Sequence, residues 1–533
     1  MPGMTVKTAT QDLLRAVDMT TVFGNPGSTE IGFLQDWPDD FRYVLGLQES
    51  AVVGMADGYA QARNHAAFVS LHSAGGVGHA MGGIFTAVRN QTPLVITAGQ
   101  QSRSLMAHRP FLGASSATEF PKPYVKWSCE PARAEDVPLA IAQAYTIAMQ
   151  RPCGPTFVSI PADDWSHPAA PVVAPEKSRN ITADPTKLGE VIEAVDRSVR
   201  PAIVAGPAIG RENMLGEMID LAEHINAPVW SAPIASRKNF DEGHRLYQGH
   251  LPAVPELLAE ILGGYDLVLV LGAPAFTIHV PGNISILDSV GPIYQITDDP
   301  DAVAISPSVK SILASMGGVL PALRKGVRPN EKRAQPPLRK AIAPAEETSP
   351  LSAEYVLQTV SELAPADSIF LEESPSYKDA LQMYLPASGN KDFFAMASGG
   401  LGFGVPAAAG IAMARPDKRV IAFIGDGSSM YSFQAIWTAG QHRLPVTYII
   451  LNNQGYGAMR AFGRIMQAAD VPGTDLPGLD FAALAKGMDC AAVRVEHAED
   501  LKSVLTNSFD REGPFLIEVA VDAAIPDLYG IGE

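Results

Sequence analysis

The stretches RVIAFIGDGS (419–428) and VTYIILNNQG (446–455) decide the fold. Each is a short run rich in β-branched and aromatic residues, typical of a strand, that ends in glycine and polar residues. Both polar ends would lie at the carboxyl ends of strands, where open α/β sheets bind ligands. The glycines let the backbone approach a phosphate, and a helix after Ser428 would offer free amides to it. Asp426 and Asn453 supply oxygen ligands suited to Mg²⁺ or Ca²⁺, so the pair predicts a metal and phosphate site, although either motif alone could be an ordinary turn.

Short apolar runs alternate with helical patterns along the rest of the chain. Helices are indicated at 136–150 and 479–488, among others. Apolar strands separated by helices indicate parallel sheets that are covered on both faces. Strands are predicted at 20–23, 66–71, 93–99, 155–160, 201–206, 266–272, 292–297, 367–373, 419–425, 446–452 and 514–521.

Two segments are proline-rich and lack apolar periodicity, and we interpret them as linkers: 166–186 and 326–350. We therefore expect three doubly wound α/β domains with mainly parallel sheets, at 1–170, 186–326 and 350–533. No strong sequence repeat relates the three parts.

The composition limits the class of protein. The 533 residues are 47% hydrophobic and 18% charged, which predicts a globular chain with large cores. A formal charge of −17 argues against a nucleic-acid partner. The three cysteines form no CxxC pair and are expected to be reduced. No secretory signal is evident, and the nearest long uncharged apolar run, 398–414, is glycine-rich and contains Pro406, so we expect a cytoplasmic protein without a membrane span.

The paired motifs resemble the diphosphate-binding motif of thiamine diphosphate (ThDP) enzymes, which reads GDG, about 25 residues, then NN. The resemblance implies that Asp426, Asn453 and the backbone carbonyl of Gly455 hold the metal, which in turn holds the cofactor. It also implies a pyrimidine-binding first domain, a central domain and a diphosphate-binding third domain. Pro375 stands where relatives carry a hydroxyl residue, so one hydrogen bond to the cofactor is open to question. Further cofactor-binding residues implied in this way are Asn25, Pro26, Ser374, Pro375, Ser376, Gly425, Gly427, Ser428, Tyr431, Tyr456, Gly457 and Ala458.

The glycine cluster GGLGFG (399–404) has two interpretations. It could be a dinucleotide-binding loop, but it follows FFAMAS rather than a clear strand and turn, and Arg419 stands where an acidic ribose partner would be expected. In the ThDP interpretation, Gly399 offers its carbonyl to the cofactor's amino group. Leu401 is then the bulky residue beneath the cofactor.

Glu49 lies in LGLQESAVVGMADGYAQA (45–62), immediately before an apolar helical run. An exposed glutamate favoured by the helix dipole is the commoner explanation for a single glutamate at such a position. The surrounding pattern resembles the ThDP family, where this acid bonds the pyrimidine ring and drives carbanion formation. In that role we expect a poorly solvated side chain with a raised pKa.

Ser28, His72 and His279 follow predicted strand ends. A lone histidine is more often a surface or core residue, but these segments resemble benzoylformate decarboxylases over essentially the full chain. The resembling segments include VFGNPGS, LHSAGG, LGAPAF, ASGGLGF and NNQGYGAMR. By the resemblance, Ser28 binds the substrate carboxylate, His72 protonates the alkoxide and His279 serves later proton transfer, as the near-neutral pKa of histidine permits.

The resemblance also implies a reaction: an aromatic 2-oxo acid of the benzoylformate type loses CO₂ through a ThDP carbanion and enamine and leaves as an aldehyde. It implies a place in the mandelate pathway of aromatic catabolism, and a homotetramer built from dimers with shared active sites. An apolar wall would accept the aryl group, although ordinary core packing could explain each of its residues. The residues implied for this wall are Phe111, Leu112, Ala458, Met459 and Phe462.

Three alternatives remain. A carboligase or lyase of 2-hydroxy carbonyl compounds would share the enamine. A flavin-linked oxidase or synthase would hold FAD in the central domain. A non-catalytic binding protein with the ThDP fold is opposed by the presence of Glu49, Asp426 and Asn453.

Overall fold

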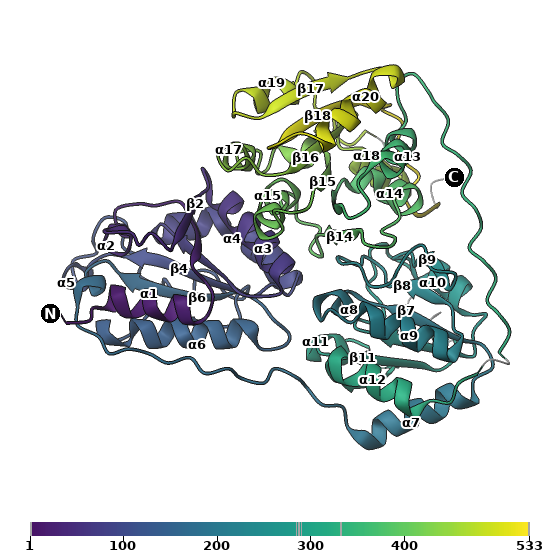
Figure 1. Cartoon of the computed structure of the whole chain (residues 1–533), viewed down its shortest axis with the longest axis horizontal. Coiled ribbons are helices and arrows are strands. Elements are labelled where there is room, and N and C mark those ends of the chain that lie inside the picture. Colours follow the sequence, from purple (N-terminus) through teal and green to yellow (C-terminus); the bar gives the residue numbers. More distant parts are fainter. Residues whose placement is uncertain are drawn as a thin grey trace.

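The computed structural model describes residues 3–283, 285, 288, 290–306, 308–330, 333–468 and 470–530, and its chain folds into three α/β lobes (Figure 1). Each lobe contains a six-stranded sheet, and every strand pairing is parallel. Helices cover both faces of the sheets, because strands joined by helical crossovers in one direction bury both of their faces. The expected fold class is therefore confirmed.

The first sheet has the order β2-β1-β3-β4-β6-β5. Helix α3 (Glu49–Arg63) begins where the Gln48 side chain accepts the backbone N–H groups of Ser50 and Ala51, so the predicted helix start before the apolar run is confirmed. The remaining elements are α1 (Val6–Ala16), β1 (Thr21–Gly24), α2 (Ile31–Leu34), β2 (Arg42–Leu45), β3 (Ala67–Leu71), α4 (Ser73–Arg89), β4 (Leu94–Gln100), α5 (Arg103–Met106), β5 (Ser128–Cys129), α6 (Val137–Met149) and β6 (Thr156–Pro161).

The middle sheet has a different order, β12-β11-β10-β7-β8-β9, which is the dinucleotide-fold order 3-2-1-4-5-6 read from the other edge. Its elements are α7 (Pro185–Arg197), β7 (Pro201–Ala205), α8 (Pro207–Arg211), α9 (Leu215–Ile225), β8 (Val229–Ser231), β9 (Tyr247–His250), α10 (Pro255–Leu262), β10 (Leu267–Leu271), β11 (Ile293–Thr297), α11 (Pro300–Ala304), β12 (Lys310–Leu313) and α12 (Met316–Gly326).

The third sheet, β14-β13-β15-β16-β18-β17, repeats the strand order of the first. Its elements are α13 (Ala353–Leu363), β13 (Ile369–Glu373), α14 (Lys378–Tyr384), β14 (Asp392–Ala395), α15 (Gly404–Ala414), β15 (Val420–Gly425), α16 (Asp426–Ser429), α17 (Ala435–Gln441), β16 (Val446–Asn452), α18 (Gly457–Ile465), α19 (Phe481–Lys486), β17 (Ala491–Val495), α20 (Ala498–Phe509) and β18 (Phe515–Ala520).

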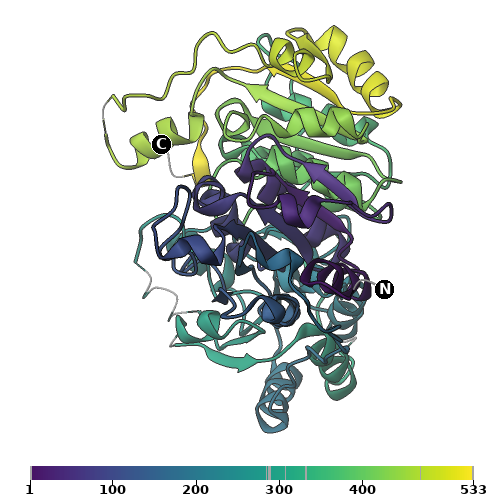
Figure 2. The ribbon, with the colours of Figure 1, turned by 90° about the vertical axis from the view of Figure 1, so that its left-hand side faces the viewer.

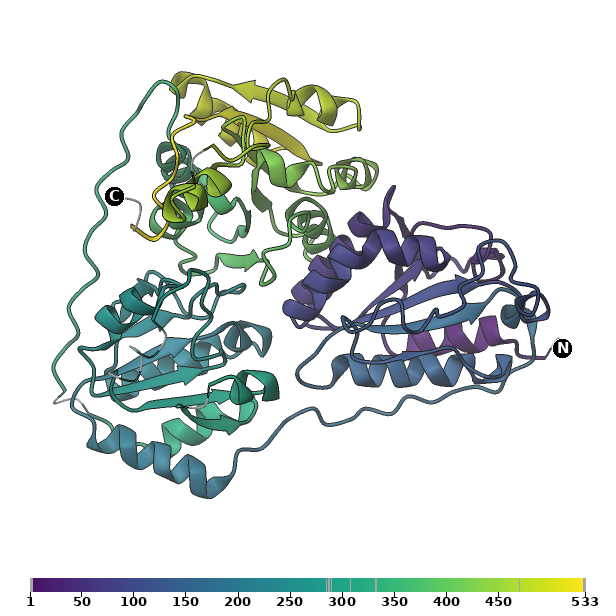
Figure 3. The same ribbon diagram turned by 180° about the vertical axis from the view of Figure 1, so that it is seen from behind.

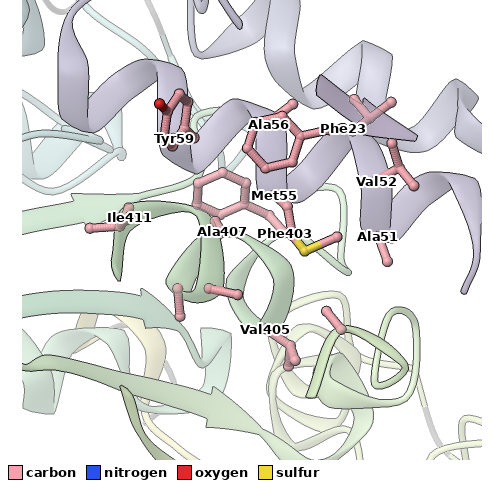
Figure 4. Packing of buried hydrophobic residues seen from close by; sticks show 14 of the residues in the cluster. Phe23, Ala51, Val52, Met55, Ala56, Tyr59, Phe403, Val405, Ala407 and Ile411 are labelled. Atoms are coloured by element: carbon pink, nitrogen blue, oxygen red, sulfur yellow. The ribbon is translucent and has the colours of Figure 1, made fainter. Parts of the chain in front are cut away.

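One hydrophobic core joins the first and third lobes. Helices α3 and α15 are buried along almost their whole length and cross between the two sheets (Figure 4). Glycines let the backbones approach: a Cβ on Gly58 would lie 2.3 Å from the carbonyl oxygen of Ala407, and one on Gly410 only 1.9 Å from that of Met55. Figure 2, seen from the side of the first lobe, shows this lobe in front, with the third lobe extending above it. The two sheets are therefore held in one fixed relationship.

Two extended segments on the outside of the molecule connect the lobes (Figures 1 and 3). Residues 169–184 and 334–350 contain neither helix nor strand. No helix of the described residues is long and apolar enough to cross a membrane. All three cysteines are free thiols.

Every strand predicted from the sequence is present, with ends shifted by at most two residues. The strands that were not predicted are β2, β5, β8, β9, β12, β14 and β17, and all except β8 lie at sheet edges. Edge strands are shorter and less apolar because one side has no partner strand, so their sequence signal is weaker.

Candidate active site

A cavity of about 440 Å³ opens at the carboxyl edge of the third sheet, where β13, β14, β15 and β16 all end. Loops of the middle lobe and the C-terminal segment complete its wall. The predicted site residues that line it are His279, Ser374, Pro375, Ser376, Gly399, Leu401, Gly425, Asp426, Gly427, Ser428, Asn453, Gly455, Tyr456, Ala458, Met459 and Phe462. This edge of an open α/β sheet is where the paired motifs predicted a ligand.

The oxygens predicted to bind a metal converge on one backbone amide. The Gly455 N–H donates to Asp426 Oδ2 at 3.0 Å and to Asn453 Oδ1 at 3.1 Å. Asp426 Oδ1 accepts the Gly427 N–H at 2.6 Å. Both side chains are buried, and burial raises the pKa of Asp426. A buried carboxylate beside an amide oxygen is a donor set that fits Mg²⁺ or Ca²⁺, whose charge would offset the cost of burying the acid.

The helix expected after Ser428 starts earlier than predicted, at Asp426. Helix α16 spans only Asp426–Ser429, with Met430 as its C-cap, and the Ser429 hydroxyl donates to the Asp426 carbonyl. The amides expected to face a phosphate are therefore those of a single turn. Gly427 is required there, since a Cβ would lie 2.3 Å from the ring of Tyr456.

In the segment after β13, one serine hydroxyl has a hydrogen-bond partner and another has none. The Ser376 hydroxyl accepts the Ala458 N–H at 2.9 Å. Ser374 lines the cavity, and its buried hydroxyl oxygen has no hydrogen-bond partner in the described part of the chain. An unpartnered buried hydroxyl beside Pro375 fits a polar cofactor in this cavity.

Glu373 holds the glycine cluster in place. It is fully buried, and its two carboxylate oxygens accept the N–H groups of Gly402 and Gly404. Burial raises its pKa to about 8, although the backbone hydrogen bonds oppose this shift. Gly399 and Gly402 have φ of +72° and +104°, which favours glycine, and a Cβ on Gly404 would lie 2.4 Å from Ile424. The cluster is therefore a tightly fastened loop that presents Gly399 and Leu401 to the cavity.

His279 forms part of the far wall. Its Nδ1 lies 2.9 Å from the hydroxyl of Tyr529, and its ring meets that of Phe462 edge-on at 5.0 Å. Burial and the charge of Lys378 lower the pKa of His279. Met459 and Phe462 on α18 make this end of the cavity apolar.

A second group of predicted residues gathers at the carboxyl edge of the first sheet. Glu49 is buried at the start of α3, where Oε1 accepts the Asn25 side-chain N–H at 3.3 Å and Oε2 lies 3.1 Å from Nδ1 of His79. The close approach of α4 depends on Gly76, since a Cβ there would lie 3.2 Å from the carboxylate. The predicted burial of Glu49 is confirmed.

Glu30 orients His72. Its carboxylate accepts the N–H groups of Gly27 (2.9 Å) and Gly99 (3.0 Å) and the hydroxyl of Thr29 (2.6 Å). Nδ1 of His72 lies 2.9 Å from Oε2. An ionised carboxylate only accepts, so Nδ1 carries a proton and Nε2 is the atom free to exchange one. A Cβ on Gly27 would lie 2.1 Å from the His72 ring, so glycine is required there.

The two groups do not meet within one chain. Arg89 is the only first-lobe residue among those that line the described cavity. Phe111, whose side chain is 88% exposed, and Leu112 lie on the loop after α5, away from the cavity. The other predicted site residues outside the cavity lining are Asn25, Pro26, Ser28, Glu49, His72, Tyr431 and Gly457.

The polar residues of these two groups that were not predicted include Glu30, His79, Glu373 and Tyr529. Glu30 and Glu373 each follow or end a strand beside a predicted residue, which is a signal that could have been used. His79 lies seven residues, two helical turns, after His72. Tyr529 is 250 residues from His279 and left no local signal.

Comparison with known families identifies the three lobes. Residues 4–118, 188–324 and 376–519 match the N-terminal TPP-binding, central and C-terminal TPP-binding domains of thiamine pyrophosphate enzymes. The chain therefore belongs to the thiamine pyrophosphate enzymes, and thiamine diphosphate is its cofactor.

Within that family the chain is similar to benzoylformate decarboxylases. It is 42% identical to the benzoylformate decarboxylase of Pseudomonas aeruginosa, over 98% of this chain and 100% of that protein. The crystal structure of benzoylformate decarboxylase from Polynucleobacter necessarius has a TM-score of 0.95 at 38% identity, covering 98% and 99% of the two chains. The Rhodococcus jostii RHA1 4-hydroxybenzoylformate decarboxylase has a TM-score of 0.93 at 40% identity, covering 98% and 100%.

Proposed function

We propose that the enzyme decarboxylates an aromatic 2-oxo acid of the benzoylformate type, without oxidation, to the aldehyde and CO₂. The observation that carries this proposal is that one cavity is polar at the strand ends and apolar at the wall formed by α18 and the C-terminal segment. Bound thiamine diphosphate supplies the electron sink for loss of CO₂. The chain supplies binding, orientation and proton transfer.

At the polar end, Asp426, Asn453 and the Gly455 carbonyl would hold Mg²⁺ or Ca²⁺. The amides of the 425–428 turn would face the diphosphate. Glu373 accepts the N–H groups of Gly402 and Gly404 and so fastens the loop that carries Gly399 and Leu401.

At the apolar end, Ala458, Met459 and Phe462 from α18 would contact the aryl group, together with Ile278 and Leu528. The small Ala458 leaves room for a ring, and Phe462 offers an edge or a face to it. The aromatic substrates in the names of the similar proteins support the same choice.

Proton transfer falls to the first-lobe group and to His279. Glu49 would bond the pyrimidine ring of the cofactor. His72, oriented by Glu30, would exchange a proton at Nε2, and Ser28 would bind the substrate carboxylate. His279 would serve the later proton transfer before the aldehyde leaves.

These roles need two copies of the chain, because Glu49 and His72 do not line the cavity that contains Asp426. We propose a dimer that pairs the first lobe of one copy with the third lobe of the other, and a tetramer of two such dimers. The exposed Leu105, Phe111 and Phe120 lie in the segment after β4 and give it an apolar surface for this contact.

The test is CO₂ release from a panel of aryl and alkyl 2-oxo acids with added ThDP and Mg²⁺. We expect kcat/KM for benzoylformate to exceed that for pyruvate by at least about tenfold, because a phenyl ring buries more apolar surface than a methyl group. Equal values would contradict the aryl preference. Incorporation of labelled aldehyde faster than CO₂ release would favour the carboligase alternative.

A further inference from the structure

The C-terminal segment returns to the cavity and ends beside the middle lobe. After β18 the chain reaches a short 3₁₀ turn at Leu528–Gly530, where Tyr529 Oη lies 2.9 Å from Nδ1 of His279. The two rings meet edge-on, with centroids 6.1 Å apart. Tyr529 thus links the end of the third lobe to the loop after β10.

Both partners of this contact are anchored through their backbones. The Tyr529 N–H donates to the Asp379 carboxylate at 3.1 Å, and the His279 N–H donates to the Ala253 carbonyl at 2.9 Å. Tyr529 also stands between the active-site cavity and an adjoining cavity of about 260 Å³, since both are lined by it. The phenol is therefore a fixed part of the wall.

The protonation states give the hydrogen bond a direction. Burial, assisted by Asp379, raises the pKa of Tyr529 to about 12, so the phenol keeps its proton at neutral pH. Burial and Lys378 lower the pKa of His279, so the imidazole is neutral there. Within the described part of the chain the phenol has no other hydrogen-bond partner, so its proton has an acceptor only if Nδ1 is unprotonated.

We propose that Tyr529 is a positioning residue for His279: its hydroxyl donates to Nδ1 and fixes the tautomer that carries the proton on Nε2. The inference deepens the proposed function, on which it rests, because it decides which ring atom His279 uses for proton transfer. Nε2–H is then the donor, and the fixed ring cannot turn to present Nδ1 instead.

The contact also shifts the ionisation of His279 in a definite direction. A hydrogen bond donated to the neutral imidazole disfavours the imidazolium, so it lowers the pKa of His279. The charged and titratable groups that face the ring are Lys378 and Asp379 on α14 and Tyr529 itself, while Phe462 on α18 is uncharged. Replacing Tyr529 by Phe removes one hydroxyl and keeps the ring. It should raise the pH midpoint of His279 ionisation by about half a unit to one unit.

The experiment measures this midpoint without relying on turnover. Purified holoenzyme is treated with diethyl pyrocarbonate across a pH series, and modification of His279 is followed by peptide mass mapping in wild type, Tyr529→Phe and Tyr384→Phe. Tyr384 is the matched control, since its hydroxyl bonds the Ala343 carbonyl at 3.3 Å, outside the lining of the cavity. We expect the midpoint to rise in Tyr529→Phe only, and an unchanged midpoint would overturn the proposal.

Kinetics then separate this proposal from the proposed function. Tyr529→Phe should lower kcat for benzoylformate by about three- to tenfold with little change in KM. Because Tyr529 acts through His279, the double variant with His279→Ala should match His279→Ala alone, and additive losses would contradict the positioning role. If wild type fails to decarboxylate 2-oxo acids, the proposed function falls, while the modification midpoint still decides the hydrogen bond.

Discussion

The first and third lobes share one scaffold but use it in different ways. Both sheets have the order second, first, third, fourth, sixth, fifth strand, and both place their predicted site residues at the carboxyl edge. In the third lobe that edge encloses a cavity whose lining includes four glycines, at 399, 425, 427 and 455, beside the buried carboxylate of Asp426. In the first lobe it carries ionisable side chains in contact with one another, the pairs Glu30–His72 and Glu49–His79.

In the proposed function this difference separates cofactor binding from proton transfer. Backbone amides and a buried carboxylate suit a metal and a diphosphate, which need fixed charges and close approach. Histidine–carboxylate pairs suit proton movement, because imidazole gains and loses a proton near neutral pH. Helices α3 and α15, which occupy equivalent positions in the two lobes, pack against each other and hold the two edges in place.

In the third lobe, loss of the Asp426 carboxylate should abolish tight binding of the cofactor. Asp426→Asn removes the negative charge that would hold the metal, while leaving an oxygen to accept one of the two N–H groups. We expect ThDP affinity in the presence of Mg²⁺, measured by calorimetry, to fall by more than about 100-fold, since even outer-shell partners of a metal cost 10- to 100-fold. The exposed Asp417→Asn serves as the control, and unchanged binding in Asp426→Asn would disprove the metal assignment.

In the first lobe, loss of the Glu49 carboxyl group should lower turnover but leave binding of the cofactor almost unchanged. Glu49→Gln keeps the shape of the side chain but has no carboxyl proton to share with the pyrimidine nitrogen of the cofactor. We expect decarboxylation to fall by about 10²- to 10⁴-fold, the range for loss of general acid–base catalysis, with ThDP affinity changed only a few-fold. Normal turnover would show that the first lobe does not activate the cofactor.

Mixing these two variants tests whether each active site combines Glu49 of one chain with Asp426 of another. In a dimer of Glu49→Gln with Asp426→Asn, one site combines both substitutions and the other has neither, if the site is shared between chains. Random co-assembly should then restore about a quarter of the wild-type activity per chain. No recovery would indicate that Glu49 and Asp426 of the same chain work together.

The sequence predicted the buried strands and the local motifs but not the contacts between distant segments. The apolar strands and the GDGS and NNQG turns are local signals, and they were found. Sequence comparison within the chain found no repeat, yet the first and third sheets have one strand order, because many apolar sequences fit the same sheet. The contact of Tyr529 with His279 depends on the packing of two lobes, which no local pattern encodes.

Glu30 offers a smaller test of the first-lobe half. Glu30→Gln replaces one accepting oxygen with an NH₂ group, which donates. One of the donors that now bond to the carboxylate would then lose its acceptor. We expect kcat to fall by about 10- to 100-fold, as for other residues that orient a catalytic ligand, while ThDP affinity is retained. Glu190→Gln, on the surface of α7, should have no effect, and a normal kcat for Glu30→Gln would show that His72 needs no fixed tautomer.

The smallest expected effect is on stability, from a substitution where α3 and α15 cross. Gly410→Ala would place a Cβ 1.9 Å from the Met55 carbonyl oxygen, so the two helices must move apart. Overpacking of this kind lowers the free energy of unfolding by about 1–3 kcal/mol, measured by urea denaturation of the holoenzyme. Gly189→Ala on α7 is the matched control: its Cβ meets nothing within 4 Å, and it should raise stability by about 0.5–1 kcal/mol through helix propensity. If Gly410→Ala is as stable as Gly189→Ala, the close crossing does not hold the lobes together, and the fixed relationship between the two edges must come from elsewhere in their joint core.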